Sequence, residues 1–311
     1  MKFRPLPLIA LTLSLFLSNC TKDNIINNKV PTADAGESKT IKVNETPGSI
    51  TLSGKGSDAD GKIVGYTWSQ VSGPNAAQIV NDGAAETEVN NLIVGTYIFQ
   101  LMVVDNDGAT GLDTTSLIVT GPVYDTLALQ PNKNPDEVHI WGNSSLNGSG
   151  PAQPEIGAAA WTSGDNVTMR AAFKFNLSSI PSNAVIKSAK LTLYSNPTPL
   201  NGDHISANSG TDNSMLIQRI TTDWAAASVT FNNQPSSTNT NQVIIPSTSQ
   251  GFLDLPDVDV TELVKNMTGA NSNYGFLIKL QNETPYNSRI FCSSFYTTES
   301  KHPKLVVVYS K

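Results

Sequence analysis

Residues 95–108 read GTYIFQLMVVDNDG, and they contain the clearest strand signal in the chain. Large side chains occupy every second position of this stretch: Tyr97, Phe99, Leu101 and Val103. Strict alternation of this kind is typical of a strand with one face in a core. Val64, Tyr66 and Trp68 alternate in the same way after a glycine turn. The two runs and their turns predict a small β-sandwich.

Six short blocks lie in and around these strands, in a fixed order. They are Ala33–Gly36, Leu52–Gly54, Ser57–Gly61, Tyr66–Gln70, Gly95–Tyr97 and Val104–Gly108. Together the blocks resemble a PKD-type domain over residues 31–121. The resemblance implies an immunoglobulin-like β-sandwich that serves as a spacer or interaction module on extracellular proteins. From the residues alone, Trp68 is expected to be the buried indole of a central strand, and Tyr97 a corner tyrosine.

A second domain is expected over residues 122–311, after a natural break at Gly121-Pro122. The sequence predicts a loop-rich beginning for this domain, up to about residue 166. Strand patterns then follow at residues 169–177, 186–194, 274–280 and 304–309. One short helix is expected around Leu263, with Asp259 and Glu262 as a capping box at its start and Gly269 at its end.

Several blocks of this second domain also have a family likeness. The blocks are Arg170–Pro181, Ile186–Tyr194, Asp223-Trp224, Ser228–Pro235, Asp259–Val264, Asn273–Phe276 and Pro303–Val307. They resemble a DNRLRE-type domain, although Asn176 and Phe231 stand where Asp and Trp are usual. The resemblance implies a jelly roll on secreted and surface proteins, and some relatives bind polysaccharides, including acidic ones such as alginate. The expected fold class is all-β: an N-terminal immunoglobulin-like (PKD) β-sandwich followed by a jelly-roll β-sandwich with one short helix.

The N-terminus has the features of a secretory signal. A basic start, an apolar run over residues 6–17 and the following Cys20 predict a lipoprotein signal peptide at residues 1–19. The run is about 12 residues long, which is too short to cross a bilayer as a helix. Cys20 is then the lipidation site, and residues 20–30 form a lipidated flexible tether. The segment CTKDN at residues 20–24 resembles the sorting tag of Bacteroidetes-like surface lipoproteins, so we expect a surface-exposed outer-membrane lipoprotein of the cell envelope.

Charge and cysteine content limit the classes of function. The chain has 20 Lys and Arg against 26 Asp and Glu, a formal net charge of −6, and loss of Lys2 and Arg4 with the signal peptide would bring it to −8. An acidic chain without a basic cluster argues against nucleic-acid binding. The chain has two cysteines, so lipidation of Cys20 would leave Cys292 without a disulfide partner. Cys292 is expected to be a small core residue on a strand.

The sequence shows no catalytic constellation. The three histidines, His139, His204 and His302, lack the paired spacing of a zinc site. There is no nucleophile elbow, and the carboxylates lie mostly in polar turns, so we expect a protein that is not an enzyme. The acid-rich turns do offer calcium candidates, namely Asp58, Asp60, Asp105 and Asp107. The alternative is that these residues are ordinary turn formers next to glycine.

A carbohydrate-binding surface is the more specific hypothesis for the second domain. Sugars are bound by flat aromatic faces with hydrogen-bonding groups nearby. Trp141 and Trp161 lie outside any clean alternation and are the platform candidates, although they can equally cover the end of a sandwich. The hydrogen-bonding candidates are His139, Asn143, Asn166 and Arg170. A bidentate contact from Arg170 would suit a sugar carboxylate.

Three classes of function therefore remain open. The leading one is a non-catalytic lipoprotein of the cell envelope, held to the membrane by its lipid, that binds polysaccharide or surface glycan through the jelly roll, with the PKD-like domain as spacer. The second is a structural or adhesion protein of the surface that binds another envelope protein. The third, a polysaccharide-degrading enzyme, is disfavoured by the missing catalytic residues. Calcium is the one cofactor that the sequence suggests.

Overall fold

The computed structural model describes residues 27–310, except 45, 46, 134, 152 and 270. The chain separates into two compact units between Gly121 and Pro122. The predicted signal peptide, Cys20 and most of the predicted tether lie outside the described residues. Within the described part of the chain, no helix has the length and hydropathy needed to cross a bilayer.

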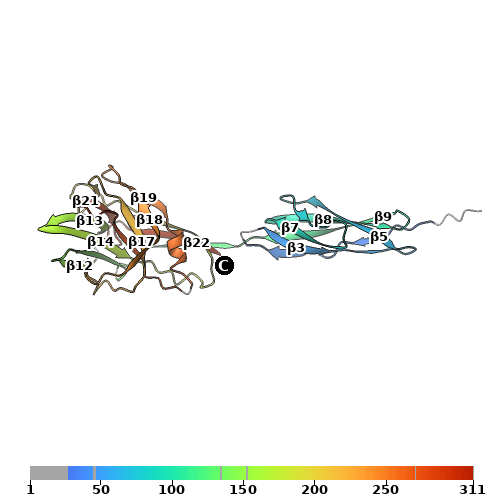
Figure 1. Ribbon diagram of the computed structural model, residues 1–311, viewed down its shortest axis with the longest axis horizontal. Coiled ribbons are helices and arrows are strands. Elements are labelled where there is room, and N and C mark those ends of the chain that lie inside the picture. The colour runs from blue at the N-terminus through green and yellow to red at the C-terminus, as the bar shows by residue number, and fades with distance from the viewer. Residues whose placement is uncertain (1–26, 45–46, 134, 152, 270, 311) are drawn as a thin grey trace, which may run out of the picture. The chain divides into compact units, whose positions relative to one another are not determined.

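The first unit is a sandwich of antiparallel strands with one parallel pair (Figure 1). One sheet has the order β2-β9-β8-β5, with bounds Lys39–Lys42, Thr110–Thr120, Gly95–Asp105 and Ile63–Ser72. A second has the order β3-β7-β6, with bounds Gly48–Ser53, Glu86–Leu92 and Gln78–Ile79. A small third sheet pairs β1 with β4, at Thr32–Asp34 and Lys55–Ser57. The predicted strand at residues 95–105 is thus β8, which pairs along both of its edges.

The core of the first unit is built on the alternating residues of β8. Tyr97 and Phe99 have no exposed surface, and their rings stack at 6.0 Å between centroids. Trp68 is 2% exposed, and its indole Nε1 donates to the carbonyl oxygen of Ala84 at 3.1 Å. The Ile93 amide donates to the Tyr97 hydroxyl at 2.9 Å, which is the contact of a tyrosine corner. Both predictions for these aromatic residues are confirmed.

The second unit contains a four-stranded and a nine-stranded sheet. The smaller sheet has the order β10-β22-β15-β19, with bounds Tyr124–Leu129, Lys304–Ser310, Ile186–Leu193 and Leu255–Asp259. The main path of the larger sheet is β16-β21-β13-β14-β20-β17-β18, at Asn208–Ser209, Asn287–Cys292, Glu155–Ser163, Asp165–Phe173, Phe276–Leu280, Met215–Ile220 and Ser237–Ile245. β11, at Glu137–Gly142, pairs with β14 and with β12, at Asn147–Pro151.

Apolar side chains from both sheets meet in one large core. Phe173, Phe175 and Phe276 form its aromatic centre, with ring centroids 5.7–6.1 Å apart. Leu191, Leu305 and their neighbours on the smaller sheet belong to the same cluster. Each unit therefore has its own hydrophobic core, and the predicted fold class of two β-sandwiches is confirmed.

The short helix forms where the sequence predicts it, but its start differs. α1 spans Thr261–Lys265, and the Asp259 carboxylate accepts a hydrogen bond from the Thr261 amide at 3.0 Å. The predicted capping box is wrong, because Glu262 pairs with Lys265 at 2.8 Å. After the helix, Gly269 has the positive φ of +72° that favours glycine. A short 3₁₀ turn at Glu299–Lys301 is the other helical element of the described chain.

The predicted loop-rich start of the second domain is wrong. Residues 123–166 contain β10, β11, β12, β13 and the start of β14. Glycine, alanine and asparagine are frequent in these strands, so the alternation of large apolar residues that predicts a strand is missing. Their structure is fixed instead by pairing, both in the hairpins β11–β12 and β13–β14 and with the distant strands β21 and β22. This pairing places both candidate tryptophans on strands.

Candidate functional site

Trp141 and Trp161 lie on the same face of the larger sheet, on the two strands that flank β14. Trp141 on β11 is opposite Met169, and Trp161 on β13 is opposite Val167. Residues directly opposite in an antiparallel pair share a face, and Val167 and Met169 are two positions apart on one strand. Two strand spacings and an offset of two residues along the strands separate the tryptophan backbones by roughly 12 Å. Both indoles are half-buried, so each still has exposed surface for a ligand.

A cavity of about 230 Å³ lies between the two indoles. Its lining includes His139, Trp141, Gln153, Trp161, Met169 and Asn201. The His139 side chain is 3% exposed, and its Nε2 atom has no hydrogen-bond partner among the described residues. The imidazole also has a hydrogen bond with the main chain of Glu155. Burial lowers the pKa of His139 to about 4, so the ring is neutral at pH 7.

The Glu155 carboxylate holds the loop that forms one wall of this cavity. The side chain is fully buried and accepts hydrogen bonds from Asn196 Nδ2 at 2.8 Å, the Leu200 amide at 2.8 Å and Asn201 Nδ2 at 2.5 Å. Three donors from one loop fix its position relative to β13. Sequence reasoning missed this role, because no local pattern distinguishes Glu155 from a solvated carboxylate.

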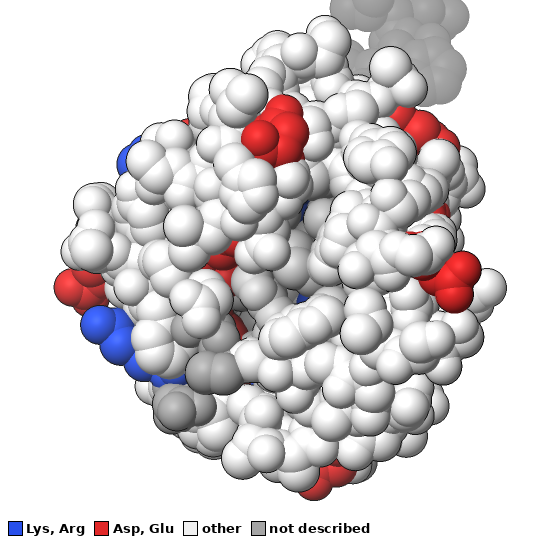
Figure 2. Space-filling model, turned by 90° about the vertical axis from the view of Figure 1, so that its left-hand side faces the viewer, with Lys and Arg blue, Asp and Glu red and all other residues white. Residues whose placement is uncertain are grey.

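A larger cavity of about 620 Å³ adjoins the first. Its lining includes Trp161, Asn201, Asp203, His204, Tyr286 and Asn287, so the two cavities share Trp161 and Asn201. Figure 2 views the second unit from the end that carries β13 and β21, and it shows a hollow in the middle of this face. Tyr286 was not among the predicted site residues. The available signal was an aromatic residue in the polar turn after Pro285.

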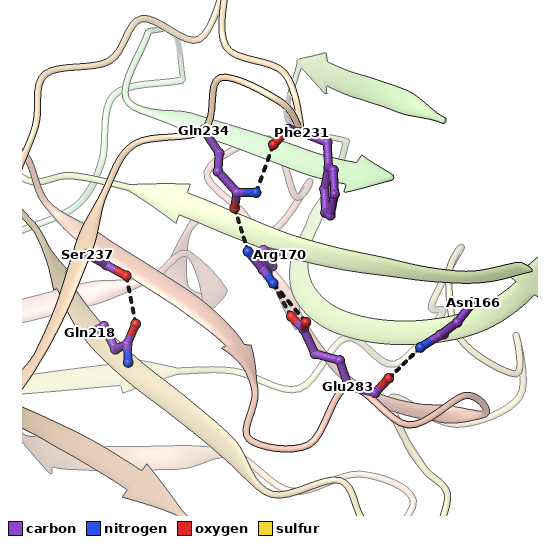
Figure 3. A network of polar contacts seen from close by, with 7 residues as sticks. All are labelled: Asn166, Arg170, Gln218, Phe231, Gln234, Ser237 and Glu283. Atoms are coloured by element: carbon purple, nitrogen blue, oxygen red, sulfur yellow. Dashed lines mark hydrogen bonds and ion pairs between the residues drawn. The ribbon is translucent and has the colours of Figure 1, made fainter. Parts of the chain in front are cut away.

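Arg170 is not among the residues that line the two cavities. It belongs to a network of polar contacts with Glu283 and Gln234 (Figure 3). Its Nε and Nη2 atoms donate to the two carboxylate oxygens of Glu283 at 2.6 and 2.8 Å, and Nη1 donates to Gln234 Oε1 at 2.7 Å. The guanidinium also lies over the Phe231 ring, 5.6 Å from its centroid. The expectation that Arg170 makes a bidentate contact with a sugar carboxylate is not met, because its Nε and Nη2 atoms already donate to Glu283.

The two predicted asparagines also have structural partners. Asn166 Nδ2 donates to the Glu283 carbonyl at 2.9 Å, and Asn143 Oδ1 accepts from the Ser145 and Leu146 amides in a tight turn. Neither residue is among those that line the two cavities. Of the predicted binding residues, the structure thus brings together His139, Trp141 and Trp161.

The calcium candidates of the first unit lie in two loops that contact each other. The Lys62 amide donates to Asn106 Oδ1 at 2.7 Å, which joins the loops. The Asp105 carboxylate accepts hydrogen bonds from Asn28, Asp107 and Ala109. Burial raises the pKa of Asp105, but these hydrogen bonds outweigh it and hold the pKa below its usual range.

The other carboxylates of these loops are used locally or are dispersed. Asp60 accepts from the Lys29 amide, Asp107 accepts from Asn106, and one oxygen of Asp58 is buried without a partner among the described residues. No group of three or more His, Cys, Asp or Glu among the described residues is arranged to hold a metal ion. A calcium site therefore stays a prediction from sequence.

The other reactive side chains described in the second unit have structural surroundings of their own. Cys292 lies on β21 with no exposed surface, as predicted, and burial raises the pKa of its thiol to about 11. His302 bonds the carbonyl of Tyr296, and Asp254 accepts from the Ser195 amide. Glu137 has a strongly shifted pKa. Burial raises the pKa of its carboxyl to about 7, although Ser294 donates two hydrogen bonds to this group. It lines neither cavity.

Comparison with protein families identifies both units. Residues 35–119 match the K319L-like PKD domain, and residues 158–309 match carbohydrate-binding module family 96. The chain therefore contains a PKD domain followed by a family 96 carbohydrate-binding module. Both domains are non-catalytic, and no catalytic domain is detected. The PKD prediction is confirmed, as is the likeness of the second domain to carbohydrate-binding modules.

Individual proteins and solved structures are also similar to parts of this chain. The mouse (Mus musculus) dyslexia-associated protein KIAA0319-like protein is 39% identical over 95 residues, which are 30% of this chain and 9% of that protein. The PKD domain from KIAA 1837 protein is 36% identical over 29% of this chain and 86% of that structure, with a TM-score of 0.27. A structure of promiscuous carbohydrate-binding modules from the β-sandwich superfamily covers 91% of this chain and 92% of its own at 14% identity and a TM-score of 0.22.

Proposed function

We propose that the second unit binds polysaccharide in the cleft between Trp141 and Trp161, without catalysis. In this proposal the PKD domain is a spacer, and a lipid on Cys20 anchors the protein in the outer membrane, facing outward. The family 96 match supports carbohydrate binding in general. The observation that carries the specific site is the placement of two half-buried indoles on one face of the sheet, around a cavity that is also lined by His139, whose Nε2 has no partner among the described residues.

The chemistry of this cleft suits a sugar. The apolar C–H face of a pyranose ring packs on an indole, and the hydroxyls need hydrogen-bond partners. Neutral His139 and the amides of Gln153 and Asn201 provide these groups without a fixed charge. A buried polar group without a partner gains most from such a contact, because it is already removed from water.

Affinity electrophoresis of the chain from residue 21 to residue 311 on a panel of neutral and acidic polysaccharides tests this function. We expect Trp141→Ala and Trp161→Ala each to weaken binding by about tenfold or more. Phe252→Ala is the matched control, because Phe252 is an exposed aromatic residue that is not among those lining either cavity. Full binding by both tryptophan variants would refute the site. No binding by the unsubstituted chain would favour the adhesion hypothesis instead.

The anchor has a separate test. Cys20→Ser removes the only proposed lipidation site and should release the protein from the membrane fraction into the soluble fraction of the envelope. Protease treatment of intact cells that express the unsubstituted chain should cleave a surface-exposed protein. Retention of the Cys20→Ser protein in the membrane would contradict lipid anchoring at this residue.

A further inference from the structure

The two cavities of the second unit meet at Trp161 and Asn201. The smaller one, at about 230 Å³, is below the roughly 300 Å³ at which small-molecule sites usually begin, whereas the larger one is well within that range. We infer that they form one extended site, which takes several consecutive sugar units of a glycan chain and has Tyr286 as a third aromatic platform. This inference rests on the proposed function and extends it beyond the tryptophan cleft.

Tyr286 is exposed, yet its position is fixed. The side chain is 70% exposed, and its hydroxyl shares a hydrogen bond of 2.8 Å with Thr162 Oγ1. Its amide donates to the Ala160 carbonyl at 2.7 Å. Both contacts tie the ring to β13, the strand that carries Trp161. An aromatic ring held in place in this way can bind a sugar with little loss of side-chain entropy.

The backbone of Tyr286 also points to a functional position. Its φ of +67° lies in the left-handed region, which a bulky residue rarely adopts. Strain of this kind persists only where the surrounding structure enforces it, and it is frequent at ligand sites. Here the neighbouring Asn287 enforces it, because its side chain bonds the carbonyls of Thr284 and Pro285 and the amide of Asp212.

The loop opposite Tyr286 supplies polar groups along the same path. Asn201 is held by Glu155 and belongs to both cavities, so it lies where a chain would pass from one to the other. Next to it, Asp203 accepts from the Ile205 and Ser206 amides and from the Ser206 hydroxyl. Burial raises the pKa of Asp203, but together these hydrogen bonds outweigh it and hold the pKa below its usual range, so the carboxyl is ionised and can accept from sugar hydroxyls.

Calorimetry with oligosaccharides of increasing length tests the inference. The probes are gluco-, manno-, xylo- and galacturono-oligosaccharides of two to six units, titrated into residues 21–311. For the series that binds, we expect affinity to rise by about tenfold or more from the shortest to the longest probe, as the second cavity fills. Tyr286→Ala should remove this gain and leave the disaccharide affinity within about twofold. Tyr286→Phe, which keeps the ring, should retain most of the gain.

The failures of the two proposals are distinguishable. Affinity that does not depend on chain length, or a gain that survives in Tyr286→Ala, would overturn the extended site and leave the tryptophan cleft standing. Absence of binding by every probe and polysaccharide would overturn the proposed function, and the extended site with it. Circular dichroism of each variant confirms that a loss of affinity does not come from unfolding.

Discussion

Arg170 and Glu283 form a two-pronged ion pair, with both carboxylate oxygens of Glu283 within 2.8 Å of guanidinium nitrogens. Their side chains are 19% and 23% exposed, so the pair is largely removed from water. The pair joins β14 to the segment between β20 and β21. Its contribution therefore belongs to the stability of the second unit, whereas the sequence suggested a role in ligand binding.

Replacement of Arg170 tests this assignment. Arg170→Met leaves a partly buried carboxylate without its partner and should lower the free energy of unfolding by about 1–3 kcal/mol in urea titrations. Glycan binding by the folded variant should stay within about twofold of the unsubstituted chain. Lys190→Met is the control, because the partner of Lys190, Asp259, is 63% exposed and such pairs contribute less than about 1 kcal/mol. A stable Arg170→Met variant that no longer binds glycan would restore Arg170 as a ligand residue.

Tyr97→Phe should destabilise the first unit alone. The substitution removes the hydroxyl that accepts from the Ile93 amide and contacts the Asn75 side chain, and it leaves a part-buried amide without a partner. We expect a cost of about 1–3 kcal/mol. Hydrogen exchange of peptides from residues 95–105 measures it, and peptides from residues 304–310 in the second unit provide the internal reference. Tyr66→Phe, which removes a hydroxyl from a neighbouring strand, should cost less; equal costs would contradict the corner role.

Glu137 and His139 should give opposite pH dependences of stability. The pKa of Glu137 rises from 4.5 to about 7 on folding, so its contribution is present below pH 4.5 and is lost as the pH rises towards 7. The pKa of His139 falls from 6.5 to about 4, so its contribution is present above pH 6.5 and is lost as the pH falls towards 4. Each contribution amounts to about 3 kcal/mol at most. Between pH 4.5 and 6.5 the two slopes offset each other.

Single substitutions separate these slopes. In Glu137→Gln the free energy of unfolding should rise with pH between about 4 and 6.5, because the contribution of His139 is then no longer offset by that of Glu137. In His139→Gln it should fall between about pH 4.5 and 7. Urea titrations at several pH values measure both. A pH profile that neither substitution changes would show that these two side chains titrate normally in the folded chain.

Gly210→Ala should disturb the site through Tyr286. Gly210 has a φ of +76°, and a Cβ atom there would meet the Tyr286 carbonyl oxygen and Asn287 Oδ1. Gly164 has nearly the same φ, +77°, but no atom within 4 Å of a Cβ. Both alanine substitutions carry a backbone cost of about 1–2 kcal/mol, but only Gly210→Ala should also weaken the binding of long oligosaccharides. Equal thermal unfolding and equal binding of the two variants would contradict the proposed coupling.

The parts of the fold that follow from local pattern were predictable from the sequence. Tyr97 and its alternating neighbours define a strand and its buried face without any other information, and Trp68 and Cys292 follow from the same reasoning. The short helix was predictable in place, because apolar spacing and the glycine after it are local signals. Its capping box was not predictable, because Glu262 could bond either the start of the helix or Lys265. In the structure it pairs with Lys265.

The site was predictable only in part, since its geometry depends on distant pairing. Trp141 and Trp161 stood out as aromatic residues without a pattern, but their common face arises because both strands pair with β14. The guanidinium of Arg170 is suited to binding a ligand carboxylate. Only the fold shows that it pairs with Glu283, more than a hundred residues later in the chain. Tyr286 and Glu155 acquire their roles from loops that meet in space, for which a single sequence has no signal.

β22 is the last strand of the described chain to leave the ribosome, yet it lies between β10 and β15 in the smaller sheet. At 5–20 residues per second, synthesis reaches residue 310 roughly 10–40 s after the first unit is complete. The first unit can fold during this interval, while the unpaired edges of β10 and β15 stay open to wrong partners. During synthesis the second unit is therefore open to wrong strand pairing for longer than the first unit.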